Sequence, residues 1–133
     1  DAAFRRAHGT EPARPLRLVT IASTTSWKSR GEEAVYSGVQ AGKAQLTRSL
    51  ARELAARFPA GSGALLVHPG GLRTPAWQKI RSDRDVSAFM DPALVAWIIW
   101  EEFDKQMEPF AEIHILREPD GTPRVERGPR PPE

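Results

Sequence analysis

Cysteine is absent from the 133-residue chain. Disulfide bonds and thiolate-ligated metal centres are therefore excluded, and the simplest compartment for such a chain is a reducing one, the cytoplasm. An excess of one charge is also missing, because 19 basic residues stand against 17 acidic ones, a formal net charge of +2. Lys and Arg are interleaved with Asp and Glu, so nucleic acid is not an expected partner.

Long apolar segments are missing too. The longest, ALVAWIIW at 93–100, has eight residues, whereas a membrane-spanning helix needs about 20. The first fifteen residues, DAAFRRAHGTEPARP, contain no apolar stretch of the kind that a signal peptide has. We therefore expect no membrane association and a cytoplasmic globular domain, for which the chain is long enough to bury a core.

Two hydrophobic periods alternate along the chain. Short apolar runs predict buried strands at 17–23, 64–68 and 111–117. Apolar residues at helical spacing predict helices at 36–58 and 93–106. Strands separated by helices of this length favour parallel pairing, with helices on both faces of one sheet.

The segments between and after these elements are polar. We expect a loop at 72–90, ended by Asp91-Pro92 as N-cap and first residue of the second helix. The tail at 118–133 is rich in proline and charge and is expected to be poorly ordered.

Three strands are few for a doubly wound sheet, and the residues before 17 are too few to supply the others. The chain is therefore predicted to be α/β, the C-terminal half of a Rossmann-type doubly wound parallel sheet. On this interpretation residues 1–117 form a partial domain that lacks the N-terminal cofactor-binding strands, and the chain is a fragment of a larger protein.

Three features are expected at the carboxyl ends of the strands, where open parallel sheets bind ligands. Ser23 ends the first strand, Tyr36 follows thirteen residues later at the start of a helix, and HPGGLRTP at 68–75 leaves the second strand. A serine hydroxyl beside a tyrosine phenol can polarise a carbonyl group and transfer a proton to it. Because a free phenol titrates near ~10, such a tyrosine needs a nearby positive charge.

With these features in this order, the sequence resembles the classical short-chain dehydrogenases/reductases. TIAS, VYSG, AQLTRSLARELA and VHPGGLRTP match the C-terminal half of the family pattern without a gap, from about Leu16 to Thr74. The resemblance implies an NAD- or NADP-dependent oxidoreductase that interconverts a carbonyl and an alcohol in a small-molecule substrate. It also implies a homodimer or homotetramer.

The resemblance assigns a role to each matching residue. Ser23 orients the substrate carbonyl, and Tyr36 donates or accepts the proton. Gln40 stands where the family has the lysine of Tyr-x-x-x-Lys, which binds the nicotinamide ribose and lowers the tyrosine pKa. The residues expected at the cofactor are Tyr36, Gln40, Pro69, Gly70, Leu72 and Thr74.

Gln40 is the departure from the family pattern. An amide keeps hydrogen-bonding capacity but carries no charge, so the electrostatic support of Tyr36 is lost at that position. Lys43 lies on nearly the same side of the helix as Tyr36. It either acts on Tyr36 through Gln40 or water, or it is a lysine that covers apolar surface or a subunit contact.

Two other interpretations stay open. The chain is either a catalytically weakened relative that binds a nucleotide or a partner, or a natural subunit whose missing strands come from a second polypeptide. His68 is expected to be structural, and His8 and His114 to be isolated, so no metal site is predicted. Trp77 lies where the family has its substrate lid and is a candidate substrate contact.

Overall fold

The computed structural model describes residues 14–28, 30–80, 85–106 and 108–130. Their strands form one four-stranded sheet in the order β1 (Arg17–Ile21), β2 (Gly63–Pro69), β3 (Phe110–Arg117), β4 (Pro123–Arg127). The first three strands are parallel, and β4 is antiparallel to β3. The α/β class and the three parallel strands are confirmed. That the sheet is half of a Rossmann-type fold stays a prediction.

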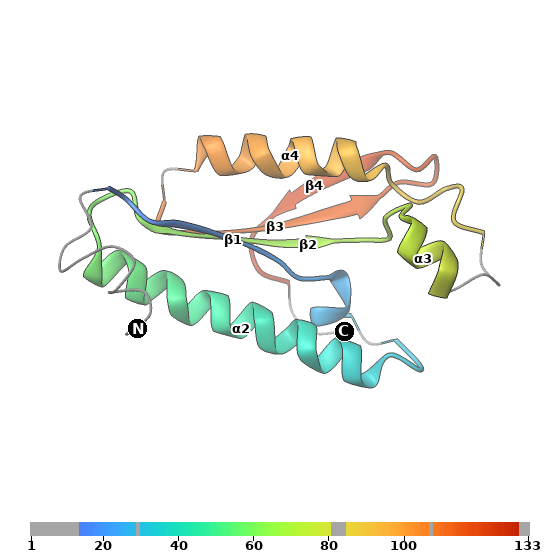
Figure 1. Ribbon diagram of the computed structural model, residues 1–133, viewed down its shortest axis with the longest axis horizontal. Coiled ribbons are helices and arrows are strands. Elements are labelled where there is room, and N and C mark those ends of the chain that lie inside the picture. Colours follow the sequence, from blue (N-terminus) through green and yellow to red (C-terminus); the bar gives the residue numbers. More distant parts are fainter. Residues whose placement is uncertain (1–13, 29, 81–84, 107, 131–133) are drawn as a thin grey trace.

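The helices cover both faces of the sheet (Figure 1). The 3-10 helix η1 (Thr24–Ser26) and the long helix α2 (Ala34–Arg57) lie on one face, and α4 (Pro92–Lys105) lies on the other. A short helix, α3 (Pro75–Ile80), follows β2 within the segment that was expected to be a loop. Thr74 explains it, because its Oγ1 accepts a hydrogen bond from the Trp77 amide at 3.2 Å and caps the first turn.

The burial of β2 shows why its sequence has no polar alternation. All seven residues are buried, as expected for a central parallel strand with both faces covered. The face toward α4 holds the larger apolar core, formed by Leu65, Val67, Met90, Val95, Ile113 and Ile115. The face toward α2 holds a small one, Ala22, Ala44 and Leu66. Buried polar residues of β2 and β3 share that second face, His68, Glu112 and His114, and this asymmetry positions the site described below.

Helix α2 turns a different side to the sheet than its largest apolar residues suggest. Its buried residues follow helical spacing and are mostly small or polar: Gln40, Ala44, Thr47, Ala51 and Leu54. Val39 and Leu46, which define the helical period in the sequence, are 56% and 59% exposed. Small side chains allow the helix to approach the sheet closely, and they leave the larger ones on the outside.

Helix α4 also has an apolar outer surface. Leu94, Trp97 and Trp100 are exposed there. No helix in the described parts of the chain combines the length and the apolar character that crossing a bilayer requires. The expected homodimer or homotetramer stays a prediction.

The predicted disorder of the tail is wrong for residues 118–130, because β4 lies within it. The turn is built by Asp120, whose carboxylate accepts hydrogen bonds from the Thr122 amide and hydroxyl at 2.9 and 2.6 Å. Gly121 follows with a φ of +87°. Asp-Gly between two extended segments is a hairpin signal, and the proline and charge content of the tail obscured it. Residues 131–133 lie outside the described residues.

This hairpin gives the first prediction. Gly121→Ala is expected to lower the free energy of unfolding by about 1–2 kcal/mol, because a Cβ is strained at positive φ. The new Cβ would also lie 3.1 Å from the Ala88 carbonyl oxygen. Chemical denaturation measures the change. Gly42→Ala in α2 is the control, since its Cβ meets nothing within 4 Å and alanine favours a helix. Equal stability of the Gly121 variant and the wild type would contradict the turn.

Candidate active site at the carboxyl edge of the sheet

The residues that the sequence predicts as a site lie at the carboxyl ends of β1 and β2. Ser23 has extended backbone angles after β1, and its Oγ accepts a hydrogen bond from the Thr25 amide at 3.3 Å. Tyr36 is in the first turn of α2, with its side chain half-exposed. Helix α2 packs against η1, so Ser23 and the first turns of α2 share this edge. Among the described residues, no hydrogen bond joins Ser23 to Tyr36.

The segment after β2 runs along the same edge. The Gly70 amide donates to the Ile115 carbonyl oxygen at 2.9 Å, which holds the first residue after Pro69 against β3. Leu72 forms an isolated parallel bridge with Met90. The segment is therefore held in place before Thr74 starts α3.

Gln40 and Lys43 have distinct environments. Gln40 is buried, and its Oε1 has no hydrogen-bond partner. Lys43 donates from Nζ to the Ile21 carbonyl oxygen at 2.6 Å. The Lys43 ammonium therefore binds the last carbonyl of β1, and Gln40 provides a buried acceptor that the described residues do not satisfy.

A chain of polar side chains connects η1, β2, β3 and α2 near Ser23, and the sequence did not predict it. Ser26 Oγ lies 2.6 Å from His68 Nδ1, and His68 Nε2 lies 2.9 Å from Glu112 Oε1. Arg48, on α2, donates from Nη2 to Glu112 Oε1 at 2.7 Å and from Nε to Oε2 at 3.2 Å. His68 and Glu112 are 1% and 5% exposed. We call these four residues the Glu112 network.

The protonation of this network follows from its geometry. Burial alone would raise the pKa of Glu112, but hydrogen bonds from His68 and Arg48 and the Arg48 charge outweigh it and lower the pKa to about 2. The carboxylate therefore accepts, and His68 Nε2 donates. The Ser26 hydroxyl donates to the Ser23 carbonyl oxygen at 2.6 Å, and its oxygen lies 2.6 Å from His68 Nδ1.

His114 extends the network without closing it. Its ring stacks on that of His68, with centroids 4.6 Å apart and planes at 10°. Nε2 lies 2.9 Å from the Gly128 carbonyl oxygen, so it carries the proton, and Nδ1 is buried without a partner. Burial and the neighbouring His68 lower the pKa of His114 to about 4. His114 is therefore neutral at pH 7.

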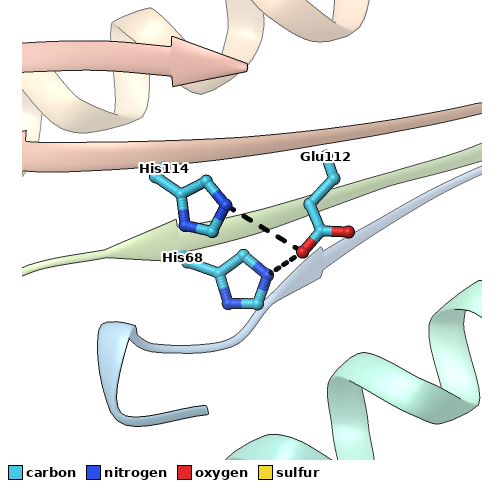
Figure 2. Close-up of side chains that lie close together, drawn as sticks. All are labelled: His68, Glu112 and His114. Carbon is cyan, nitrogen blue, oxygen red and sulfur yellow. Dashed lines mark hydrogen bonds and ion pairs between the residues drawn. The ribbon is translucent and has the colours of Figure 1, made fainter. Parts of the chain in front are cut away.

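Two histidines and a carboxylate raise the question of a metal ion. Figure 2 shows His68 and His114 one above the other, each with a nitrogen directed at one oxygen of Glu112. The three ligand atoms lie within 4.8 Å of one another. However, an imidazole binds a metal in its own plane, and two stacked parallel rings share no point in both planes. Arg48 also occupies both carboxylate oxygens. The residues do not fit a metal ion in this arrangement.

The prediction that His114 is isolated is wrong, since it contacts His68 and lies 4.0 Å from Glu112. A signal for the cluster was present in the sequence. Glu112 and His114 are two residues apart in a strand, so they share one face. His68 pairs with His114 in register on β2. The register of β2 against β3 is a tertiary property, and without it the three residues have no reason to be connected.

The network has the hydroxyl–imidazole–carboxylate order of a general-base arrangement. Ser26 is not among the residues that line the cavity at this edge. The Ser26 hydroxyl also lies 2.6 Å from the Ser23 carbonyl oxygen, and His68 Nδ1 lies 3.2 Å from it. The network therefore connects the Ser23 backbone to β2, β3 and α2, and it acts as a positioning element.

The second prediction concerns the pH dependence of stability. Because the folded pKa of Glu112 is below its unfolded value, its contribution is fully present above pH 4.5 and is lost as the pH falls toward 2. Glu112→Gln should lower the free energy of unfolding by about 3–5 kcal/mol near neutral pH, because Arg48 and His68 lose their partner.

Urea denaturation at several pH values measures this effect. The difference between wild type and Glu112→Gln should shrink below pH 4.5. Glu53→Gln is the control, since Glu53 is exposed and pairs with Arg57 at 3.6 Å across one helical turn. Parallel stability curves for wild type and Glu112→Gln through the acidic range would contradict the proposed ionisation.

Comparison with known proteins adds no relative. No protein-family model matches the chain, and no curated protein sequence matches it either. The relation to short-chain dehydrogenases/reductases therefore rests on the motifs of the chain itself and remains a prediction.

Proposed function

We propose that this chain carries the catalytic half of an NAD(P)-dependent oxidoreductase of the short-chain dehydrogenase/reductase type. The observation that carries the proposal is the gathering of Ser23, the first turns of α2 and the segment 69–74 at one carboxyl edge. Ligands of open parallel sheets bind at this edge. The parallel order β1-β2-β3 is compatible with half of a Rossmann-type sheet, to which further strands would pair at β1.

The chemistry proposed for the side chains is simple. The Ser23 hydroxyl donates a hydrogen bond to the substrate carbonyl oxygen. Tyr36 Oη gives that oxygen its proton in reduction and takes it back in alcohol oxidation. The nicotinamide dinucleotide supplies or accepts the hydride when it is bound.

One feature of the structure supports a place for the cofactor. Gln40 Oε1 is a buried acceptor without a partner, and such groups are costly unless a ligand or water satisfies them. A ribose hydroxyl is a donor of the required kind. Gln40, with Tyr36 and the segment 69–74, would hold the nicotinamide side of the molecule.

A second candidate function is a catalytically weakened relative that binds a nucleotide or a partner. The position of Lys43 favours it, because this ammonium binds the Ile21 carbonyl oxygen and Gln40 carries no charge. Among the described residues no cation is hydrogen-bonded to Tyr36. A turnover measurement distinguishes the two functions, because only the oxidoreductase converts a substrate.

The third prediction is that Tyr36→Phe lowers turnover by about 10²-fold or more, because the proton donor is removed. The measurement is NAD(P)H oxidation with a panel of small ketones and aldehydes, made on the full-length gene product. Val35→Ala is the control, because Val35 is the neighbouring residue and is 83% exposed. Unchanged turnover in Tyr36→Phe would exclude the proposed chemistry. Cofactor binding without any turnover in the wild type would favour the weakened relative.

The fourth prediction concerns Gln40→Lys. A cation at this position should move the pH optimum of the reaction down, because a nearby positive charge favours the phenolate. The pH profile of turnover measures the shift, and thermal unfolding shows whether the variant stays folded. Gln45→Lys is the control, since Gln45 is exposed on the same helix. An unchanged pH profile in a folded variant would show that Gln40 does not act on Tyr36.

A further inference from the structure

A cavity of about 350 Å³ opens at the carboxyl edge, between η1, the segment after β2 and the β3–β4 hairpin. Thr24, next to Ser23, lines it, and so do Gly70 and Gly71. Its volume lies in the range of small-molecule sites. A cavity of about 480 Å³ is lined by Phe110 and Ala111 at the opposite end of the strands, away from Ser23 and Tyr36. The cavity of about 350 Å³ therefore adjoins the candidate active site.

The charged residues that line this cavity are all basic. No Asp or Glu lines it, whereas four arginines do: Arg30, Arg117, Arg124 and Arg130. Arg124 and Arg130 are paired with acidic residues outside the cavity, Arg124 with Glu118 and both with Glu126. Two carboxylates thus pair with two of the four guanidinium groups, and a positive charge remains.

Two of the arginines have no acidic partner among the described residues. Arg117 donates from Nη1 to the Ala88 carbonyl oxygen at 3.3 Å, which leaves its charge unbalanced. Arg30 is exposed and makes no hydrogen bond or ion pair with any described residue. Because a guanidinium group binds a carboxylate or phosphate through two parallel hydrogen bonds, these side chains are suited to an anion.

The wall of the cavity is aromatic. Trp77 and Phe89 meet edge to face, with ring centroids 6.1 Å apart. Phe89 lies so close to Gly71 that a Cβ on that glycine would be 2.8 Å from the ring. Trp27 lies across the cavity and carries Arg130 over its face, at 4.9 Å from the ring centroid. Flat rings beside guanidinium groups form a surface for a flat apolar body that ends in a negative charge.

We propose that this cavity binds a small ligand in which a carboxylate or phosphate is attached to a flat apolar body. Identifying that ligand as the substrate rests on the proposed oxidoreductase function, whereas the binding site itself does not. The same anionic chemistry has a second source, because a nicotinamide dinucleotide also carries phosphates beside flat rings.

Calorimetric titration with 2-naphthoate tests the proposal, and 2-naphthamide is the neutral probe of the same shape. The carboxylate should bind at least about tenfold more tightly than the amide, because it makes charge-assisted hydrogen bonds. Added salt should weaken only the carboxylate. Amide binding as tight as that of the carboxylate, or no binding of either probe, would overturn the proposal.

Two variants locate the charge. Arg30→Gln and Arg117→Gln should each weaken 2-naphthoate binding by about tenfold and leave 2-naphthamide unchanged. Arg30 makes no described contact, so its variant remains informative even if Arg117→Gln unfolds. Arg52→Gln is the control, an exposed arginine of α2 that does not line the cavity. Unchanged affinity in a folded Arg30 variant, or an equal loss in the Arg52 variant, would overturn the proposal.

Titration with NADH on the full-length gene product separates the two sources of the anion. Simultaneous binding of NADH and 2-naphthoate would assign the cavity to an acidic substrate. Competition, together with weaker NADH binding in Arg30→Gln, would assign it to the phosphates of the cofactor. Tyr36→Phe should leave 2-naphthoate binding unchanged, so loss of the proposed function and loss of this site remain distinguishable.

Discussion

The carboxylate of Glu112 is the group on which the arrangement of the carboxyl edge depends. It lies on β3, and it accepts hydrogen bonds from Arg48 on α2 and from His68 on β2. His68 in turn lies within hydrogen-bond distance of Ser26 and of the Ser23 carbonyl oxygen. Two strands, α2 and the η1 segment that follows β1 thus meet through one buried charge. A buried charge is costly to leave unpaired, so this network constrains the relative positions of the elements more strictly than apolar contacts would.

The two faces of the sheet differ in what they bury: one holds the main apolar core, and the other holds the Glu112 network. The face toward α4 is apolar and is packed by residues such as Leu65, Val67 and Ile113, which gives the sheet its main hydrophobic stabilisation. The face toward α2 has little apolar core and holds the Glu112 network instead. The hydrogen bonds of this network hold the segments that leave β1 and β2 in place at the carboxyl edge. The aromatic cavity with unbalanced arginines adjoins the same edge. In the proposed enzyme, the residues that select the substrate would therefore lie next to Ser23, which would orient the substrate carbonyl.

Most of the fold could be predicted from local patterns. The strands and long helices are where the apolar periods and the Asp91-Pro92 cap indicate them, because these signals depend on residues close in sequence. Helix α3 and β4 were missed for different reasons. The first is a capped helix of six residues, too short to show a period, and the second lies in a segment whose composition resembles a disordered tail. The Asp120-Gly121 turn was nevertheless a usable local signal.

The sequence by itself determined the α/β class, the order of the elements and the placement of Ser23 and Tyr36 at the ends of a strand and a helix, since local patterning and short connections decide these. Tertiary structure alone decided that His68 and His114 are stacked neighbours of Glu112, because strand register and helix packing bring together residues more than 40 positions apart. It also decided that Lys43 binds the Ile21 carbonyl oxygen and that arginines from the loop before α2, from β3 and β4, and from the segment after β4 line one cavity. The physical reason is that hydrogen bonds and charges act over a few ångströms in space, whatever the separation along the chain.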